Sequence, residues 1–254
     1  MLSKAEIKRI SRYKQSKFRN QDGLFVVEGE KMLEELLKSD YNIQSIYATA
    51  PWIQKNTSLI QLKGVANKVV EISEEDLNKI SLLSTPNQVY SLVKIPQENF
   101  SNQTKGLTIV LDGIKDPGNL GTIIRLADWF AIEQIICSLD CVDLYNPKTV
   151  QSTMGSIFRT KTTYVDLKSY FESLPKSTPI YGSIVEGGES IYEKSFQKDS
   201  ILVIGSESHG ISQEIRKYIN QNITIPRFRA DNKPESLNAS IATAIIISEI
   251  LKTK

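Results

Sequence analysis

Six apolar runs of strand length recur through the second half of this 254-residue chain, and several are followed by a helix-like pattern. The runs occupy residues 107–111, 134–139, 162–165, 180–185, 201–204 and 223–225. Strands that are apolar on both faces are typical of a parallel sheet covered by helices on each side. Helical patterns over 122–130, 212–219 and 241–251 supply such cover. The sequence therefore predicts an α/β domain built on a mostly parallel sheet.

The first 95 residues alternate in the same way on a smaller scale. Strands are predicted over 24–27, 43–48, 69–72 and 89–93, and helices over 3–18, over 29–38, from Pro51 and after the capping sequence at Ser73. The polar segment 96–105 has no hydrophobic period and is predicted to be a linker. We therefore expect a small N-terminal α/β domain over 1–95 and a larger α/β domain over 106–254.

Positive charge is concentrated at the beginning of the chain, although the net charge of the whole is only +2. Against the single Glu6, residues 1–19 contain Lys4, Lys8, Arg9, Arg12, Lys14, Lys17 and Arg19. A basic end on a nearly neutral chain favours a polyanionic partner such as nucleic acid. A solvated helix face gives the same pattern, so both interpretations stay open at this point.

Several classes of protein are disfavoured by what the sequence lacks. Cys137 and Cys141 are too few for a disulfide framework and lack the companions of a zinc site, so we expect a buried thiol at Cys137 and no metal. No run reaches the roughly 18–20 apolar residues of a membrane span, and the start has no signal-peptide core. His209 is the only histidine and is expected to be a surface hydrogen-bonding group. A reduced, cytoplasmic protein without a membrane partner is expected.

Three polar loops follow predicted strands, at 112–125, 205–210 and 225–240. Open α/β sheets bind their ligands beyond the carboxyl ends of the strands, among helix N-termini. The polar groups in these loops suit positioning and hydrogen bonding rather than a metal or a covalent nucleophile. Arg125 is expected on the buried side of the first helical turn, where it needs an anionic partner such as Glu207 or a ligand phosphate.

Taken together, these loops resemble the three ordered motifs of the SpoU, or TrmH-type, RNA ribose methyltransferases of the SPOUT superfamily. The matching residues are Asn119 with Arg125, the loop from Gly205 to Gly210, and Ser236-Leu-Asn238-Ala-Ser240. The resemblance covers 106–254, and residues 1–95 are more loosely similar to the family's RNA substrate-binding module. Ser208 replaces a usual Gly or Ala, and the segment 227–235 is longer and more basic than the usual link.

The resemblance implies methyl transfer from S-adenosylmethionine to a ribose 2′-hydroxyl of structured RNA. It assigns catalysis to Arg125, Asn119, Glu207, Ser236 and Asn238, and cofactor binding to Ser183, Gly205, Ile225 and Leu237. Arg125 is either the base or a group that grips phosphate and stabilises the alkoxide, and a guanidinium rarely gives up its proton. The same resemblance implies a homodimer and a C-terminal trefoil knot.

The sequence leaves more than one interpretation of the substrate and of the activity open. A separate N-terminal module favours ribosomal RNA over transfer RNA as the substrate. A non-catalytic RNA-binding assembly factor is the second hypothesis, and the intact set of motif residues argues against it. An unrelated α/β enzyme acting on a nucleotide or phosphate substrate is the third, and it requires the ordered match of three motifs to be chance.

Overall fold

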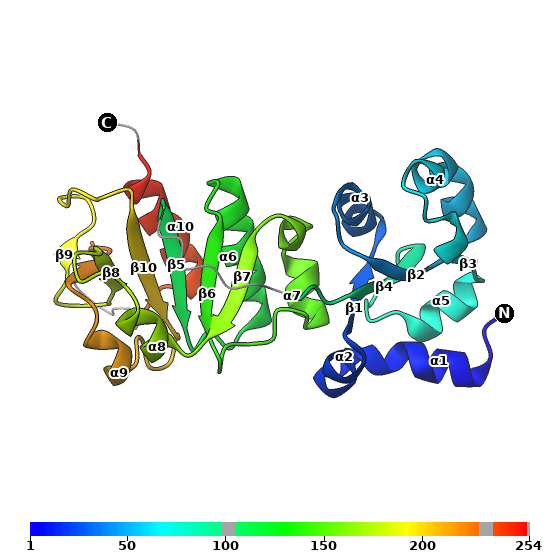
Figure 1. The fold of residues 1–254 in the computed structure, drawn as a ribbon, viewed down its shortest axis with the longest axis horizontal. Helices are drawn as coiled ribbons and strands as arrows, with labels where there is room; N and C mark the ends of the chain where they lie inside the picture. The colour runs from blue at the N-terminus through cyan, green and yellow to red at the C-terminus, as the bar shows by residue number, and fades with distance from the viewer. Residues whose placement is uncertain (98–104, 229–235, 253–254) are drawn as a thin grey trace. The chain divides into compact units, whose positions relative to one another are not determined.

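The computed structural model describes residues 1–97, 105–228 and 236–252. The chain divides into two compact units (Figure 1), one formed by 1–98 with 143–159 and the other by 99–142 with 160–254. The predicted linker 96–105 lies mostly outside the described residues. Within the described part of the chain, no helix is both long and apolar enough to cross a bilayer.

The first unit is built on a four-stranded sheet with the order β1-β4-β2-β3. Its strands are β1 Leu24–Glu28, β2 Ile43–Ala48, β3 Val69–Glu71 and β4 Val89–Lys94. Strand β4 runs antiparallel to both β1 and β2, whereas β2 and β3 are parallel. The helices are α1 Lys4–Ser11, α2 Ser16–Asp22, α3 Glu30–Lys38, α4 Ala50–Leu62 and α5 Glu74–Ile80, with short 3-10 turns at Arg12–Lys14 and Ala66–Lys68.

The helix predicted over 3–18 is two helices joined by a 3-10 turn. A capping box starts α1, in which the Ser3 side chain accepts from the backbone of Glu6 and the Glu6 carboxylate accepts in return. At the break, the guanidinium of Arg19 donates to the carbonyls of Tyr13 and Lys14, at 2.8 and 3.0 Å. The break persists because a buried cation satisfies carbonyl groups that a continuous helix would have bonded internally.

The segment Asp143–Arg159 belongs to the first unit, although the sequence placed it within the larger domain. It forms α7 Pro147–Ser152 and a 3-10 turn at Ser156–Phe158. The Tyr145 ring packs on Phe25 of β1 with centroids 4.6 Å apart, and the Tyr41 hydroxyl donates to the Ile157 carbonyl at 3.2 Å. The predicted boundary therefore differs from the compact units, because these partners are more than a hundred residues apart in sequence.

The second unit holds a seven-stranded sheet with the order β7-β6-β5-β10-β8-β11-β9, and every pairing in it is parallel (Figure 1). The strands are β5 Leu107–Asp112, β6 Gln134–Ser138, β7 Lys161–Val165, β8 Ile180–Ser183, β9 Glu189–Ser190, β10 Ser200–Gly205 and β11 Gln221–Thr224. The predicted mostly parallel α/β domain is confirmed. The two-residue strand β9 was not expected from the sequence.

Helices cover this sheet and fix where its loops emerge. They are α6 Pro117–Trp129, α8 Leu167–Glu172, α9 Gln213–Arg216 and α10 Ala239–Ile250. Leu167 of α8 and Ile215 of α9 pack in one core cluster with Val110 and Val203 of the central strands, while α6 and α10 contact each other. Asp112 and Gly205, the last residues of β5 and β10, lie opposite each other in register. The carboxyl ends of the parallel strands thus share one edge.

Candidate active site

A cavity of about 310 Å³ lies where β8, β10 and β11 end in the second unit. Ser183, Gly205, Ile225 and Leu237, the residues predicted to bind a cofactor, all line it. So do the predicted catalytic residues Glu207 and Ser236. Sequence reasoning missed further lining residues, Thr224, Phe228, Ala239 and Ala242, which are distinguished in the sequence only by being small or apolar. The volume falls within the roughly 300–1,000 Å³ of small-molecule sites.

One side chain, that of Asn119, joins the three loops. It lies on α6, is 8% exposed, and its amide donates to the carboxylate of Glu207. Its carbonyl oxygen accepts from the amide of Asn238 at 2.8 Å. Asn238 is also the N-cap of α10, because its side-chain amide oxygen accepts hydrogen bonds from the backbone N–H groups of Ser240 and Ile241. The structure therefore brings three of the five predicted catalytic residues into one hydrogen-bonded chain.

Arg125 lies differently from the prediction. Helix α6 begins at Pro117, with Asp116 as the cap, so Arg125 falls in its third turn rather than its first. Its side chain is exposed, and among the described residues it has no hydrogen bond or ion pair. The Glu207 carboxylate is occupied by Asn119 instead. The expected first-turn position and burial were wrong, because the Asp116-Pro117 cap starts the helix five residues early. Of the two anionic partners considered, Glu207 binds Asn119, and a ligand phosphate stays a prediction.

The loop after β10 requires a glycine at its start. Ser206 and Gly210 exchange backbone hydrogen bonds of 3.1 and 2.8 Å, which folds the loop back over Gly205. A Cβ atom at Gly205 would lie 2.1 Å from the Gly210 carbonyl carbon and 2.2 Å from the Ile211 nitrogen. Only a residue without a side chain lets the two backbone segments approach this closely.

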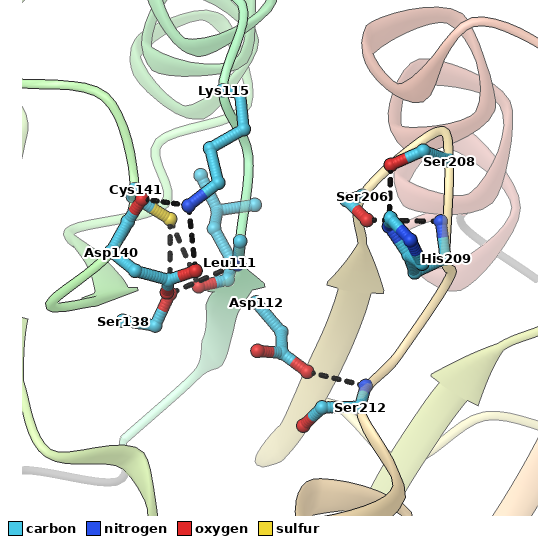
Figure 2. A network of polar contacts seen from close by, with 11 residues as sticks. Leu111, Asp112, Lys115, Ser138, Asp140, Cys141, Ser206, Ser208, His209 and Ser212 are labelled. Carbon is cyan, nitrogen blue, oxygen red and sulfur yellow. Dashed lines mark hydrogen bonds and ion pairs between the residues drawn. The ribbon is translucent and has the colours of Figure 1, made fainter.

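Asp112 and the loop after β6 form a supporting network that sequence reasoning missed (Figure 2). Asp112 is 8% exposed, and its carboxylate accepts from the Ser212 N–H at 2.7 Å, which ties the first loop to the second. The Ser138 hydroxyl accepts from the Gly113 N–H at 2.9 Å, and Lys115 bridges to Asp140 at 2.6 Å. The signal in the sequence is an aspartate directly after an apolar run, followed by a glycine.

The thiols and the histidine lie as expected. Cys137 is fully buried, which confirms the buried thiol, and a hydrogen bond from Cys137 lowers the pKa of Cys141 to about 7. His209 is exposed, and its Nδ1 lies 2.7 Å from the Ser208 hydroxyl (Figure 2). Over the residues that the structure describes, no three or more His, Cys, Asp or Glu side chains are grouped to hold a metal ion.

The basic residues at the start of the chain are not all available to a partner. Lys4, Lys8, Arg9, Lys14 and Lys17 are exposed. Arg12 pairs with Asp22 and lies over the Phe18 ring, with its guanidinium carbon 5.2 Å from the centroid. Arg19 is 2% exposed and binds the Asp143 carboxylate in addition to its two carbonyls. The RNA-binding prediction for Arg19 is therefore wrong, because its side chain is buried and both terminal nitrogens of its guanidinium bind groups inside the unit.

One unit has a parallel α/β sheet with a small-molecule cavity at its carboxyl edge, and the other has an α/β fold with a basic helix. These features define a class of two-unit protein that suits an organic ligand and a polyanion. The family described as SpoU rRNA Methylase matches residues 106–248, and the MRM3-like substrate binding domain matches residues 4–91. The chain belongs to the SpoU rRNA Methylase family. Membership confirms the predicted resemblance to the SpoU-type RNA methyltransferases.

Relatives along the whole chain agree with this assignment. The 23S rRNA (guanosine(2553)-2′-O)-methyltransferase RlmP of Bacillus subtilis is 27% identical, over 91% of this chain and 90% of its own. A TrmH-family structure from Porphyromonas gingivalis is 35% identical with a TM-score of 0.82, covering 98% of both chains. An AdoMet-bound rRNA methyltransferase from Sinorhizobium meliloti is 24% identical, covers 98% of this chain and 95% of its own, and shares the fold with a TM-score of 0.84.

Proposed function

We propose that this chain methylates a ribose 2′-hydroxyl of ribosomal RNA and holds S-adenosylmethionine in the cavity at the ends of β8, β10 and β11. The observation that carries this proposal is the convergence of Ser183, Gly205, Ile225 and Leu237 on that cavity. Because Gly205 has no side chain, the backbone of Gly210 packs directly against it, and this close packing sets the wall of the cavity. When bound, the cofactor supplies an electrophilic methyl group.

The chain's own residues would orient the ribose and manage its charge. Asn119 fixes the carboxylate of Glu207 at the cavity wall, and Ser236 adds a hydroxyl group to the lining of the same cavity. Alignment of this kind lowers the barrier because the reacting groups are already placed. The exposed guanidinium of Arg125 would grip an RNA phosphate and stabilise the alkoxide that develops at the 2′-oxygen.

Ribosomal RNA is preferred over transfer RNA as the substrate. The support is the match of residues 4–91 to an MRM3-like substrate binding domain, together with relatives whose names specify 23S rRNA. A non-catalytic assembly factor is disfavoured because Asn119, Glu207 and Asn238 retain their mutual hydrogen bonds. We place the protein in the cytoplasm. The trefoil knot stays a prediction from the family resemblance.

A homodimer is part of the proposal. Trp129 of α6 is 85% exposed and Ile241 of α10 is 52% exposed, on two helices that contact each other. Large exposed apolar side chains on neighbouring helices are typical of an interface between protein chains. Arg125 precedes Trp129 by four residues and therefore lies on the same face of α6. A second copy covering this face would lie beside Arg125.

Two experiments test the proposal. The first is calorimetric titration of the protein with S-adenosylmethionine. The second is a methyl-transfer assay on ribosomal and transfer RNA purified from cells that lack this protein. We expect saturable binding of the cofactor and one new 2′-O-methyl site in ribosomal RNA. Absence of binding at millimolar cofactor would overturn the methyltransferase proposal. Methylation confined to transfer RNA would overturn the substrate but not the reaction.

The exposed lysines and arginine of α1 are expected to contribute to RNA affinity. Replacing Lys4, Lys8 and Arg9 together by alanine should weaken RNA binding and flatten its salt dependence, because each phosphate contact releases about 0.7–0.9 of a counterion. The slope of log affinity against log salt should fall in magnitude by about two to three. Since all three side chains are exposed, the melting temperature should not change. An unchanged slope would mean that this face is only solvated.

A further inference from the structure

A second cavity, of about 460 Å³, is formed entirely by the first unit. Val26 and Glu28 of β1 lie on one side, and Leu82 and Val150 add apolar surface from the loop after α5 and from α7. Lys14 and Lys148, both exposed, also line it. The other lining residues are Leu83, Asn146, Pro147 and Gln151. A chamber with apolar walls, one acidic side chain, two amides and two cations has the composition of a site for an organic ligand that carries phosphate.

Glu28 is a buried carboxylate with unused hydrogen-bonding capacity. It is 4% exposed, accepts from the Ser81 hydroxyl on one oxygen, and accepts from the Leu82 N–H at 3.0 Å on the other. An ionised carboxylate has about four lone-pair sites, so each oxygen keeps one acceptor position. Burial raises the pKa of Glu28, and none of the described residues forms an ion pair with it. A ligand with two N–H donors would compensate this desolvated group.

We propose that this cavity binds a guanine nucleotide, with the Watson–Crick edge of the base on Glu28 and its phosphates beside Lys14 and Lys148. Guanine presents two adjacent donors, N1–H and the N2 amino group, which match one free acceptor position on each carboxylate oxygen. Val26, Leu82 and Val150 supply the apolar surface that an unstacked base requires. For guanosine within RNA, this inference rests on the proposed function.

The other bases fit this acceptor pair poorly. Adenine and cytosine each offer one amino group beside a ring nitrogen that is itself an acceptor, so one carboxylate oxygen would face a lone pair. Uracil offers one N–H between two carbonyl groups, which repel a carboxylate. A matched pair of hydrogen bonds discriminates between bases by about 1–3 kcal/mol, equivalent to about five- to 150-fold in affinity. Guanine preference is therefore the signature of the site.

Fluorescence anisotropy of the full chain with labelled pentamers UUGUU, UUAUU and UUIUU, without S-adenosylmethionine, tests the inference. We expect the guanosine pentamer to bind at least about tenfold tighter than the adenosine pentamer, with inosine between them because it lacks the N2 amino group. Guanosine monophosphate and adenosine monophosphate as competitors distinguish the source of the nucleotide. If guanosine monophosphate competes at a concentration similar to that of the pentamer, the natural ligand is a free nucleotide. If it competes only in large excess, the natural ligand is RNA.

Variants separate base recognition from phosphate contact. Glu28→Gln should remove the guanosine preference, whereas Glu34→Gln, on the exposed face of α3, should retain it. Lys148→Ala should weaken all pentamers a few fold with the preference unchanged, and Lys63→Ala, exposed elsewhere in the unit, should change neither. If Glu28→Gln fails to fold, the wild-type ranking of guanosine, inosine and adenosine decides.

Equal binding of the three pentamers by the wild-type chain, or no binding of any, overturns the guanine site. So does a guanosine preference that survives in folded Glu28→Gln. None of these results involves methyl transfer, which is measured separately with the cofactor. The two proposals can therefore fail separately. The chain can methylate RNA without preferring guanosine, or prefer guanosine without methylating RNA.

Discussion

Gly205→Ala is expected to weaken binding of S-adenosylmethionine by at least about a hundredfold, because the added methyl group would collide with backbone rather than with a movable side chain. Its Cβ would lie 2.1 Å from the Gly210 carbonyl carbon, so the loop from Ser206 to Gly210 must move. That loop carries Glu207, and the cavity wall moves with it. Calorimetric titration of the purified variant with the cofactor measures the loss.

Gly23→Ala is the matched control for this substitution. Gly23 also has a conformation that favours glycine, with φ of +63°, but nothing lies within 4 Å of its Cβ position. It should cost about 1 kcal/mol of stability and leave the cofactor affinity unchanged. Near wild-type affinity in Gly205→Ala would show that the loop relaxes freely, and it would remove Gly205 from the proposed cofactor site.

The parallel sheet and the meeting of the three loops were predictable because both follow from local pattern. Runs that are apolar on both faces require cover on both faces, and the carboxyl ends of parallel strands share an edge. That edge brings Asn119 of the first loop to Glu207 of the second and Asn238 of the third. The identity of the bonded pairs was not predictable. Nothing in the spacing shows that Glu207 binds Asn119 rather than Arg125.

The remaining errors concern partners that are distant in sequence. Arg19 has the composition of a surface cation, yet it is buried because Asp143, from the other half of the chain, supplies its counter-charge. The same segment, Asp143–Arg159, joins the first unit through ring packing and a hydrogen bond that no local period signals. Helix starts were misjudged where a cap such as Asp116 precedes the apolar pattern.

Arg125→Ala is expected to lower the rate of methyl transfer by about 10²–10³-fold, the usual cost of removing one group that stabilises developing charge. Cofactor affinity should stay within about threefold, because Arg125 does not line the cavity. Single-turnover methylation of ribosomal RNA measures the first quantity and calorimetry the second. Lys168→Ala, an exposed cation on α8, is the control and should behave as wild type. Wild-type turnover in Arg125→Ala would remove this residue from the reaction.

Arg125→Lys then separates a base from a charge stabiliser, since lysine titrates near a pKa of about 10.4 whereas arginine stays protonated. A base must be neutral, so the ratio of variant to wild-type rate would rise as pH increases towards 10. A stabiliser must be cationic, so the ratio would be constant near neutrality and fall above pH 10. We expect the second profile, because a guanidinium rarely gives up its proton. A rising ratio would assign proton removal to position 125.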